Sequence, residues 1–159
     1  MKFEANFKNG IQEGSTKKYF DNGNLHYKTT FQNNKMHGMY TEYIPTGEKI
    51  YDISYNNGLK EGPSKKYYKS GNIEQDYTYK NNKLDGIIKE YHGVGTLASQ
   101  SKYINDKPEG VMKKYFNNGK PKLEITFKDG KAVKGFEYIQ YGTKKELTHA
   151  HFNSMALEY

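Results

Sequence analysis

Two histidines near the end of the sequence, His149 and His151, have a spacing that could bind a metal ion. Residues i and i+2 lie on the same face of a β-strand, and imidazole nitrogens are common zinc ligands. No third ligand stands at a fixed spacing from this pair. We therefore interpret both histidines as polar residues opposite Ala150 and Phe152, and we expect no metal site.

The sequence also lacks the motifs that carry catalysis or hold a cofactor. It has no nucleophile motif, no P-loop and no dinucleotide fingerprint, and we interpret Gly93-Val94-Gly95 as a turn. Its carboxylates stand among polar residues, so none has the apolar environment that prepares a carboxylate for acid–base work. We therefore expect a protein that is not an enzyme, has no catalytic residue and uses no cofactor.

Tyrosine, in contrast, recurs at a fixed interval. The tyrosine column, as we name this row, consists of Tyr19, Tyr43, Tyr67, Tyr91 and Tyr115. Tyrosine presents a large area with little rotamer entropy and is enriched where proteins bind partners, so the column could be a contact stripe. Packing between neighbouring repeats is the alternative, and a ring in a one-layer sheet can do both.

Lysine precedes most of these tyrosines by two residues. The basic ladder, as we name this second row, consists of Lys17, Lys65, Lys89 and Lys113. It could attract an acidic protein face or an anionic head group. The alternative is a surface that keeps a repeat sheet soluble, and Thr41, Glu42 and Glu90 interrupt the ladder. An acidic row, which we expect to balance lysines near the turns, consists of Glu13, Glu61, Asp85 and Glu109.

The composition is basic and polar. The 159 residues include 25 Lys+Arg and 18 Asp+Glu, and the net charge of +7 favours acidic proteins, anionic lipid or nucleic acid as partners. Nucleic acid is disfavoured because the chain lacks arginine, which makes forked contacts to phosphate and guanine. With 34% hydrophobic residues, no cysteine and no long apolar run, we expect a soluble, cytoplasmic protein without a thick two-layer core.

A 24-residue repeat organises the whole chain. An aromatic residue recurs at Phe7, Phe31, Tyr55, Tyr79, Tyr103 and Phe127. Asn-Gly pairs such as Asn9-Gly10 and Asn22-Gly23 separate β-prone runs, so each unit contributes two short strands. We therefore predict an all-β fold: an elongated, single-layer antiparallel β-meander of 24-residue hairpin units. The pattern of the first strand in each unit leaves open which face is more buried.

We expect these units to form a single repeat domain over residues 1–159. Complete units start near residues 7, 31, 55, 79 and 103. The pattern degrades from Phe127, where Gly135 comes one residue late, so we expect residues 127–159 to form a degenerate unit that caps the array. Residues 153–159 could add a short terminal turn.

The unit Phe7-Lys-Asn-Gly-Ile-Gln-Glu-Gly-Ser-Thr-Lys-Lys-Tyr-Phe-Asp-Asn-Gly23 resembles the bacterial MORN repeat variant (MORN_2), and the resemblance extends to about Gly135. Ordinary MORN repeats have Gly-x-Trp-type cores, whereas this chain has no tryptophan. Proteins made only of such repeats resemble a family of antitoxins, which implies an antitoxin or immunity protein that binds and neutralises a cognate toxin. The alternative is a membrane-associated scaffold that binds anionic phospholipid through the basic ladder. Self-association through strand edges stays open under both.

Overall fold

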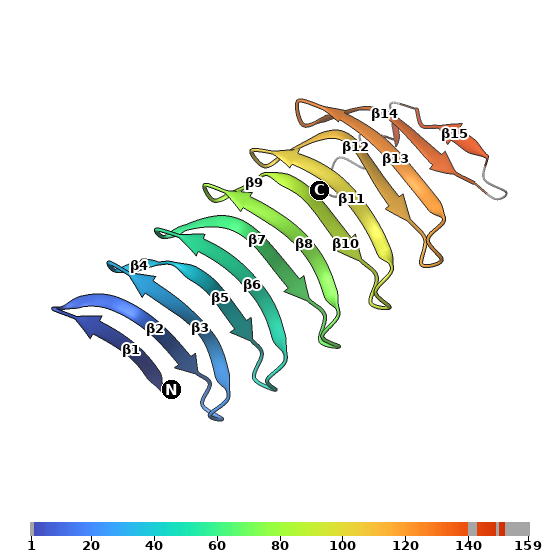
Figure 1. Cartoon of the computed structure of the whole chain (residues 1–159). Helices are drawn as coiled ribbons and strands as arrows, with labels where there is room; N and C mark the ends of the chain where they lie inside the picture. The colour runs from blue at the N-terminus through green and yellow to red at the C-terminus, as the bar shows by residue number, and fades with distance from the viewer. Residues whose placement is uncertain (1, 140–142, 149, 152–159) are drawn as a thin grey trace. The chain divides into compact units, whose positions relative to one another are not determined.

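The structure, a computed structural model, describes residues 2–139, 143–148 and 150–151. Within these residues the strands form a single open antiparallel sheet of 15 strands, which confirms the predicted all-β meander of hairpin repeats (Figure 1). The chain divides into two compact units, Met1–Lys83 and Leu84–Tyr159. The expectation of one repeat domain over the whole chain stays a prediction.

Each unit is built from strands that pair in chain order. In the first unit the order is β1-β2-β3-β5-β6-β7-β8, and β4 also pairs with β3. Its strands are β1 (Phe3–Lys8), β2 (Ile11–Tyr19), β3 (Leu25–Gln32), β4 (Lys35–Met36), β5 (Gly38–Tyr43), β6 (Lys49–Asn56), β7 (Leu59–Tyr67) and β8 (Ile73–Lys80).

In the second unit the order is β10-β11-β12-β13-β14-β15. Its strands are β10 (Gly86–Tyr91), β11 (Leu97–Ile104), β12 (Lys107–Tyr115), β13 (Pro121–Lys128), β14 (Lys131–Tyr138) and β15 (Lys144–Glu146). The two-residue strand β9 (Lys83–Leu84) contains the last residue of the first unit and the first residue of the second.

The first turn of each repeat is a two-residue turn that begins with asparagine or aspartate. Both central residues have a positive φ, for example 51° at Asn9 and 77° at Gly10, and this is the signature of a type I′ turn. The same pair of positive angles occurs at residues 33–34, 57–58, 81–82, 105–106 and 129–130. The twist of a type I′ turn matches that of antiparallel strands, so these short sequences set the hairpin register.

The second turn of each repeat is a longer loop that a glycine closes. In the first repeat the Gly23 N–H donates to the Phe20 carbonyl at 3.0 Å, and the Phe20 N–H donates to the Asn24 carbonyl at 2.8 Å. Gly23 has a φ of 87°, where a side chain would be strained. The pairing of β2 and β3 shifts register where this loop begins, at Tyr19.

Neighbouring first turns are joined by hydrogen bonds that run between repeats. The Asn34 N–H donates to the Gln12 carbonyl at 3.1 Å, and the Asn34 side-chain Oδ1 accepts from the Gln12 N–H at 2.7 Å. One turn residue thus supplies both a donor, its main-chain N–H, and an acceptor, its side-chain oxygen, as a residue of a paired strand does. The same two bonds join Asn82 to Lys60 and Asp106 to Leu84.

The acidic row supports the same turns. Glu13 Oε2 accepts a hydrogen bond from the Asn33 N–H at 2.9 Å. Equivalent bonds join Glu61 to Asn81, Asp85 to Asn105 and Glu109 to Asp129. These carboxylates therefore accept hydrogen bonds from backbone donors of the next repeat, and the expectation that they balance lysines near the turns stays a prediction.

At Gly58 a glycine leaves this pattern incomplete. Gly58 stands where other repeats have Asn34 or Asn82, and it offers only its own N–H, which donates to the Met36 carbonyl at 2.8 Å. We predict that Gly58→Asn stabilises the chain by about 0.5–1.5 kcal/mol, because the new side chain can accept from the Met36 N–H. Asparagine tolerates the positive φ of 83° at this position. The midpoint of urea unfolding measures the effect.

The matched control for this substitution is Gly10→Asn. Gly10 has the same turn position and a φ of 77°, but no earlier hairpin faces it in the part of the chain that the structure describes. We expect no gain from it. Equal stabilisation by both substitutions would contradict a hydrogen bond between repeats.

Strand alternation gives the sheet two faces, and the buried residues lie mainly on one of them, named here the core face. In the first unit Thr16 lies opposite Thr29, and Ser64 lies opposite Tyr77. All four are buried, with exposed fractions of 1% for Thr16 and 8% for Tyr77. The sequence pattern of the first strand did not decide which face is more buried. The structure shows that it is the face that contains Thr16. Small hydroxyl residues and tyrosines line it in this unit.

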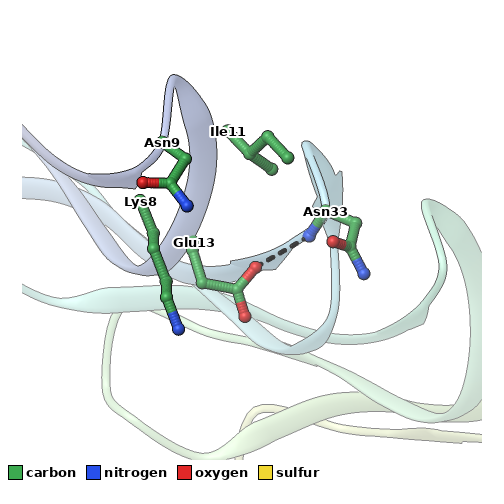
Figure 2. A pocket seen from close by; sticks show the side chains of 5 residues that line it. All are labelled: Lys8, Asn9, Ile11, Glu13 and Asn33. Atoms are coloured by element: carbon green, nitrogen blue, oxygen red, sulfur yellow. Dashed lines mark hydrogen bonds between the residues drawn. The ribbon is translucent and has the colours of Figure 1, made fainter.

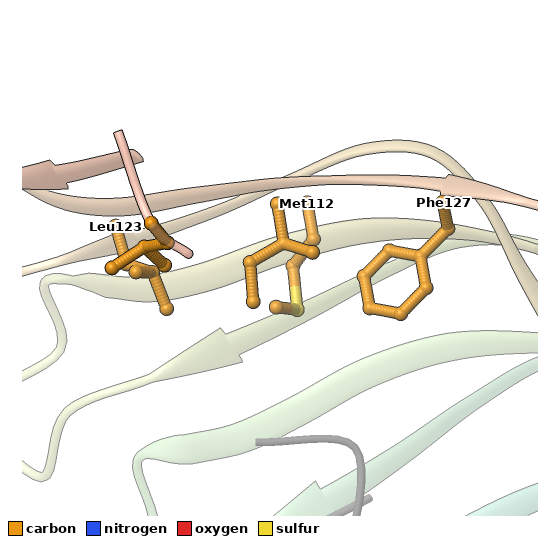
Figure 3. Close-up of a cluster of buried hydrophobic side chains, with 5 residues drawn as sticks. Met112, Leu123 and Phe127 are labelled. Carbon is orange, nitrogen blue, oxygen red and sulfur yellow. The ribbon is translucent and has the colours of Figure 1, made fainter. Parts of the chain in front are cut away.

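In the second unit the core face carries a compact apolar cluster. Its members are Met112, Leu123, Ile125, Phe127 and Leu147, with Ala132 packed against them (Figure 3). Met112 of β12 lies directly opposite Ile125 of β13, which is 1% exposed. Leu147 follows β15, and its N–H donates to the Gly135 carbonyl at 2.9 Å. Leu147 therefore extends the apolar cluster beyond the last strand.

Candidate partner-binding surface

The tyrosine column lies on the face opposite the core face, named here the column face. In the first unit its members stand at the ends of β2, β5 and β7, and in the second unit at the ends of β10 and β12. All five rings are half-buried. A half-buried tyrosine packs against the sheet and still presents an edge to solvent, so both interpretations of the column remain open.

The structure ties two of these hydroxyls to carboxylates on the neighbouring strand. The Tyr19 hydroxyl donates to Glu4 Oε2 at 3.0 Å, and the Tyr67 hydroxyl donates to Asp52 Oδ2 at 2.8 Å. In each pair the carboxylate precedes the tyrosine by 15 residues. These tyrosines are therefore oriented by the sheet itself, which reduces the entropy that a partner would have to remove on binding.

Asp52 is the centre of a polar cluster on the column face. Its Oδ1 accepts from Thr41 Oγ1 at 2.8 Å, and its Oδ2 accepts from Lys49 Nζ at 2.7 Å as well as from Tyr67. Burial acts to raise the pKa of Asp52, but the hydrogen bonds from Lys49, Tyr67 and Thr41 outweigh it and hold the pKa below its ordinary value. One ionised carboxylate thus connects β5, β6 and β7.

Lysine also contacts the ring in this cluster. Lys49 Nζ lies 4.1 Å from the centroid of the Tyr67 ring, within cation–π range. A similar group occurs at β1, where Lys2 Nζ lies 2.6 Å from Glu4 Oε1 and 5.2 Å from the centroid of the Tyr19 ring. The hydrogen bond from Lys2 is the main reason why the pKa of Glu4 is lowered.

The second unit repeats the combination of lysine, carboxylate and tyrosine at its last strands. Lys144 donates to Glu124, and this bond is the main reason why the pKa of Glu124 is lowered. A hydrogen bond from Tyr138 lowers the same pKa further. Analysis of the sequence missed all three clusters, and the 15-residue separation of carboxylate and tyrosine in the first two is the signal that could have found them.

The basic ladder also lies on the column face, beside acidic residues of adjacent strands. Lys17 lies opposite Glu4 and Lys28, and Lys65 lies opposite Asp52 and Asp76. Lys89 lies opposite Gln100, and Lys113 lies opposite Gln100 and Glu124. Lys113 Nζ lies 3.8 Å from Glu124 Oε1. A carboxylate therefore offsets the charge of the ladder at Lys17, Lys65 and Lys113, and the ladder is not a continuous stripe of positive charge.

Exposed apolar residues form a further row on the column face. Met39, Ile87 and Val111 have exposed fractions of 46%, 51% and 51%, and Pro63 is exposed at the equivalent position of its repeat. Each precedes a column tyrosine by four residues, so alternation places it on the same face. Analysis of the sequence missed this row, although its members recur at 24-residue spacing, which is a signal that the sequence contains.

Together these rows give most first strands a triplet of side chains in line. The triplets are Pro63, Lys65 and Tyr67 on β7, Ile87, Lys89 and Tyr91 on β10, and Val111, Lys113 and Tyr115 on β12. On β5 a threonine replaces the lysine. Each triplet combines an apolar contact, a cation and an aromatic ring on one solvent-facing surface, and this is the candidate binding surface of each unit.

A second aromatic group lies on the core face of the first unit. The ring centroids of Tyr27 and Tyr40 are 5.5 Å apart, and those of Tyr40 and Tyr55 are 6.2 Å apart. Burial raises the pKa of Tyr40, and Glu42 raises it further. Burial also raises the pKa of Tyr55. These rings pack on one another in the manner of a core.

The two histidines that were considered as metal ligands cannot be placed as a pair, because His149 lies outside the described residues, as do residues 153–159. His151 is described, and its Nδ1 lies 2.8 Å from Thr148 Oγ1. Within the described ranges, no group of three histidine, cysteine or acidic side chains is arranged to hold a metal. No helix there is long and apolar enough to span a membrane.

An open antiparallel sheet of hairpin repeats, with the same residue types at the same place in each repeat, defines a β-repeat protein. A family model described as "MORN repeat variant" matches the chain three times, at residues 12–33, 60–81 and 108–129. Three segments of the chain therefore match this repeat type, as the sequence resemblance predicted. Repeats of this kind suggest a module for binding.

No curated protein matches the sequence. Among the solved structures that match is a chain of "Crystal structure of GtfA/B complex bound to UDP and GlcNAc", at 12% identity and a TM-score of 0.32. That match covers 83% of this chain and 26% of the other, so this chain spans about a quarter of its length. A likeness of this size supports no conclusion about function.

Proposed function

We propose that this chain is a non-enzymatic binding module and that it binds a protein partner through its column face. The observation that carries the proposal is the triplet of exposed apolar residue, lysine and half-buried tyrosine that recurs on β7, β10 and β12. Aromatic and apolar anchors supply most of the energy of protein interfaces, and surrounding charges supply steering and specificity.

The spacing of the triplets suits a partner that contacts several repeats at once. Within a unit, equivalent positions of neighbouring repeats are two strands apart, or roughly 10 Å. A standard interface buries roughly 800 Å² on each partner, which is more than one triplet can offer. Orientation of Tyr19 and Tyr67 by carboxylates lowers the entropic cost of the contact.

The partner that we propose is a cognate toxin, which the module neutralises by direct binding as an antitoxin or immunity protein. The resemblance of the repeat unit to repeat-only antitoxins supports this identity. The alternative is a scaffold held on anionic phospholipid by the basic ladder. Carboxylates opposite Lys17, Lys65 and Lys113 argue against it, since they reduce the field that would attract a lipid surface.

The experiment that tests the proposal is a pull-down of the full chain from native lysate, at about 0.15 M and about 0.5 M salt, followed by identification of the bound protein. We expect one stoichiometric partner that survives high salt and is toxic when it is produced alone. Capture of anionic vesicles that is lost at high salt, with no such partner, would support the scaffold instead.

The binding surface is tested with two substitutions in the second unit. We predict that Ile87→Asp with Val111→Asp weakens binding to the recovered partner more than about tenfold, because both place a charge in the contact. The control is Val94→Asp, since Val94 is 74% exposed and lies in the turn after β10, outside the strands that carry the triplets. Equal loss in both variants, with unchanged folding, would show that the column face is not the contact.

A further inference from the structure

The chain contains four Asn-Gly sequences, each of which can deamidate without an enzyme. They are Asn9-Gly10, Asn22-Gly23, Asn57-Gly58 and Asn118-Gly119. In this reaction the backbone nitrogen of the glycine attacks the side-chain Cγ of the asparagine, because a glycine has no Cβ to obstruct the approach. Local sequence makes the four sites nearly equivalent, so differences between them must come from the fold.

Both sites in the longer loops are held at the asparagine and at the glycine. The Asn22 side chain donates to the Pro45 carbonyl at 2.7 Å and accepts from the Asn24 N–H at 3.0 Å. The Asn118 side chain accepts from the Lys120 N–H at 3.0 Å. The N–H groups of Gly23 and Gly119 donate to carbonyls at 3.0 Å and 2.8 Å within the same turns. Attack at either site must first break these bonds.

Asn57 is held through its glycine. The Gly58 N–H, which belongs to the attacking nitrogen, donates to the Met36 carbonyl of the preceding repeat at 2.8 Å. The turn must separate from the preceding hairpin before this nitrogen can approach Cγ.

Asn9 has none of these restraints. Within the described part of the chain, neither its side chain nor the Gly10 N–H forms a hydrogen bond. Asn9 is exposed and lines an open pocket of about 250 Å³ with Lys8, Ile11 and Glu13 (Figure 2). The turn belongs to β1, which is paired on one side only and therefore frays more easily than an inner strand.

We propose that Asn9 is the site at which this chain deamidates first. The Gly10 nitrogen forms a bond to Asn9 Cγ, the bond from Cγ to Nδ2 breaks, and Nδ2 leaves as ammonia with the amide proton. Water then adds across one C–N bond of the cyclic imide and yields aspartate or isoaspartate. Isoaspartate lengthens the backbone by one methylene and places a new negative charge near Glu13, so the type I′ turn loses its geometry.

The test compares the four sites in the intact, folded chain during incubation at mildly alkaline pH. Digestion and mass spectrometry quantify the asparagine that remains and the isoaspartate that forms at each site. We expect Asn9 to convert roughly two- to tenfold faster than Asn57, because one hydrogen bond fewer must break. Conversion of Asn22, Asn57 or Asn118 as fast as Asn9 in the folded chain would overturn the proposal.

Two controls separate the effect of the fold from that of local sequence. In concentrated urea we expect the four sites to convert at similar rates, and a preference for Asn9 that persists there would also overturn the proposal. Asn9→Asp removes the reacting amide and leaves a turn like that of Asp129-Gly130, which has the same pair of positive φ angles. We expect this variant to release less ammonia and to keep the unfolding midpoint of the unmodified chain.

Discussion

Ile125→Ala is expected to lower the free energy of unfolding of the second unit by about 2–5 kcal/mol. Ile125 is 1% exposed, lies opposite Met112 and belongs to the cluster that Leu123, Phe127 and Leu147 complete. A single-layer sheet has few fully buried apolar side chains, so the cavity has little surrounding material that could collapse into it. Denaturant unfolding followed by circular dichroism measures the loss.

The matched control is Ile87→Ala, which makes the same change in the same unit. Ile87 is 51% exposed on the column face, so its truncation removes less buried area and creates no cavity. We expect a cost of less than about 1 kcal/mol. Equal costs at the two positions would mean that the apolar cluster is not the stabilising core of this unit.

Asp52→Asn is expected to destabilise the first unit by about 1.5–3 kcal/mol at neutral pH, because a neutral amide cannot replace charge-assisted hydrogen bonds to Lys49 and Tyr67. The folded-state pKa of Asp52 is lowered from 3.8, so the stability that its ionised form provides is present above that value. It is lost as the pH falls through the lower folded-state pKa. The two proteins should therefore become equally stable at strongly acidic pH.

Asp76→Asn supplies the control for this second prediction. Asp76 occupies the same place in the next repeat, 24 residues later, and lies opposite Lys65 on the other side. Thr41, Lys49 and Tyr67 do not contact it in the way they contact Asp52, so we expect a smaller cost at neutral pH. Urea unfolding at a series of pH values tests both. A cost of Asp52→Asn that stays constant into acid would exclude ionisation of Asp52 as its cause.

The sequence was sufficient to predict the strands, the turns and the repeat, because each depends on local chemistry. Asn9-Gly10 and its equivalents form type I′ turns wherever the chain needs positive φ at two successive residues. The regular spacing of Phe31, Tyr55 and Tyr79 then repeats this register along the chain. Even the half-buried state of the tyrosine column follows from its place in a one-layer sheet.

The contacts between strands were harder to predict, because register shifts move the partners. The pairing of β1 with β2 shifts register between Ala5 and Phe7. This shift, which the turn sequence does not predict, brings Glu4 within hydrogen-bond distance of the Tyr19 hydroxyl. The burial of Leu147 depends on its place next to Gly135, where the pairing of β14 with β15 continues, and its local sequence does not mark that position. Both features arise from tertiary geometry that single-sequence patterns do not encode.

The hydrogen bonds between successive first turns join residues that are only 20 or 22 positions apart. Loop closure over such short distances costs little chain entropy, and topologies made of short-range contacts fold faster than those that must first bring distant segments together. A nascent chain leaving the ribosome can therefore add each hairpin to the one before it as soon as that hairpin is complete. The asparagines that link the repeats thus let the sheet form in the order in which it is synthesised.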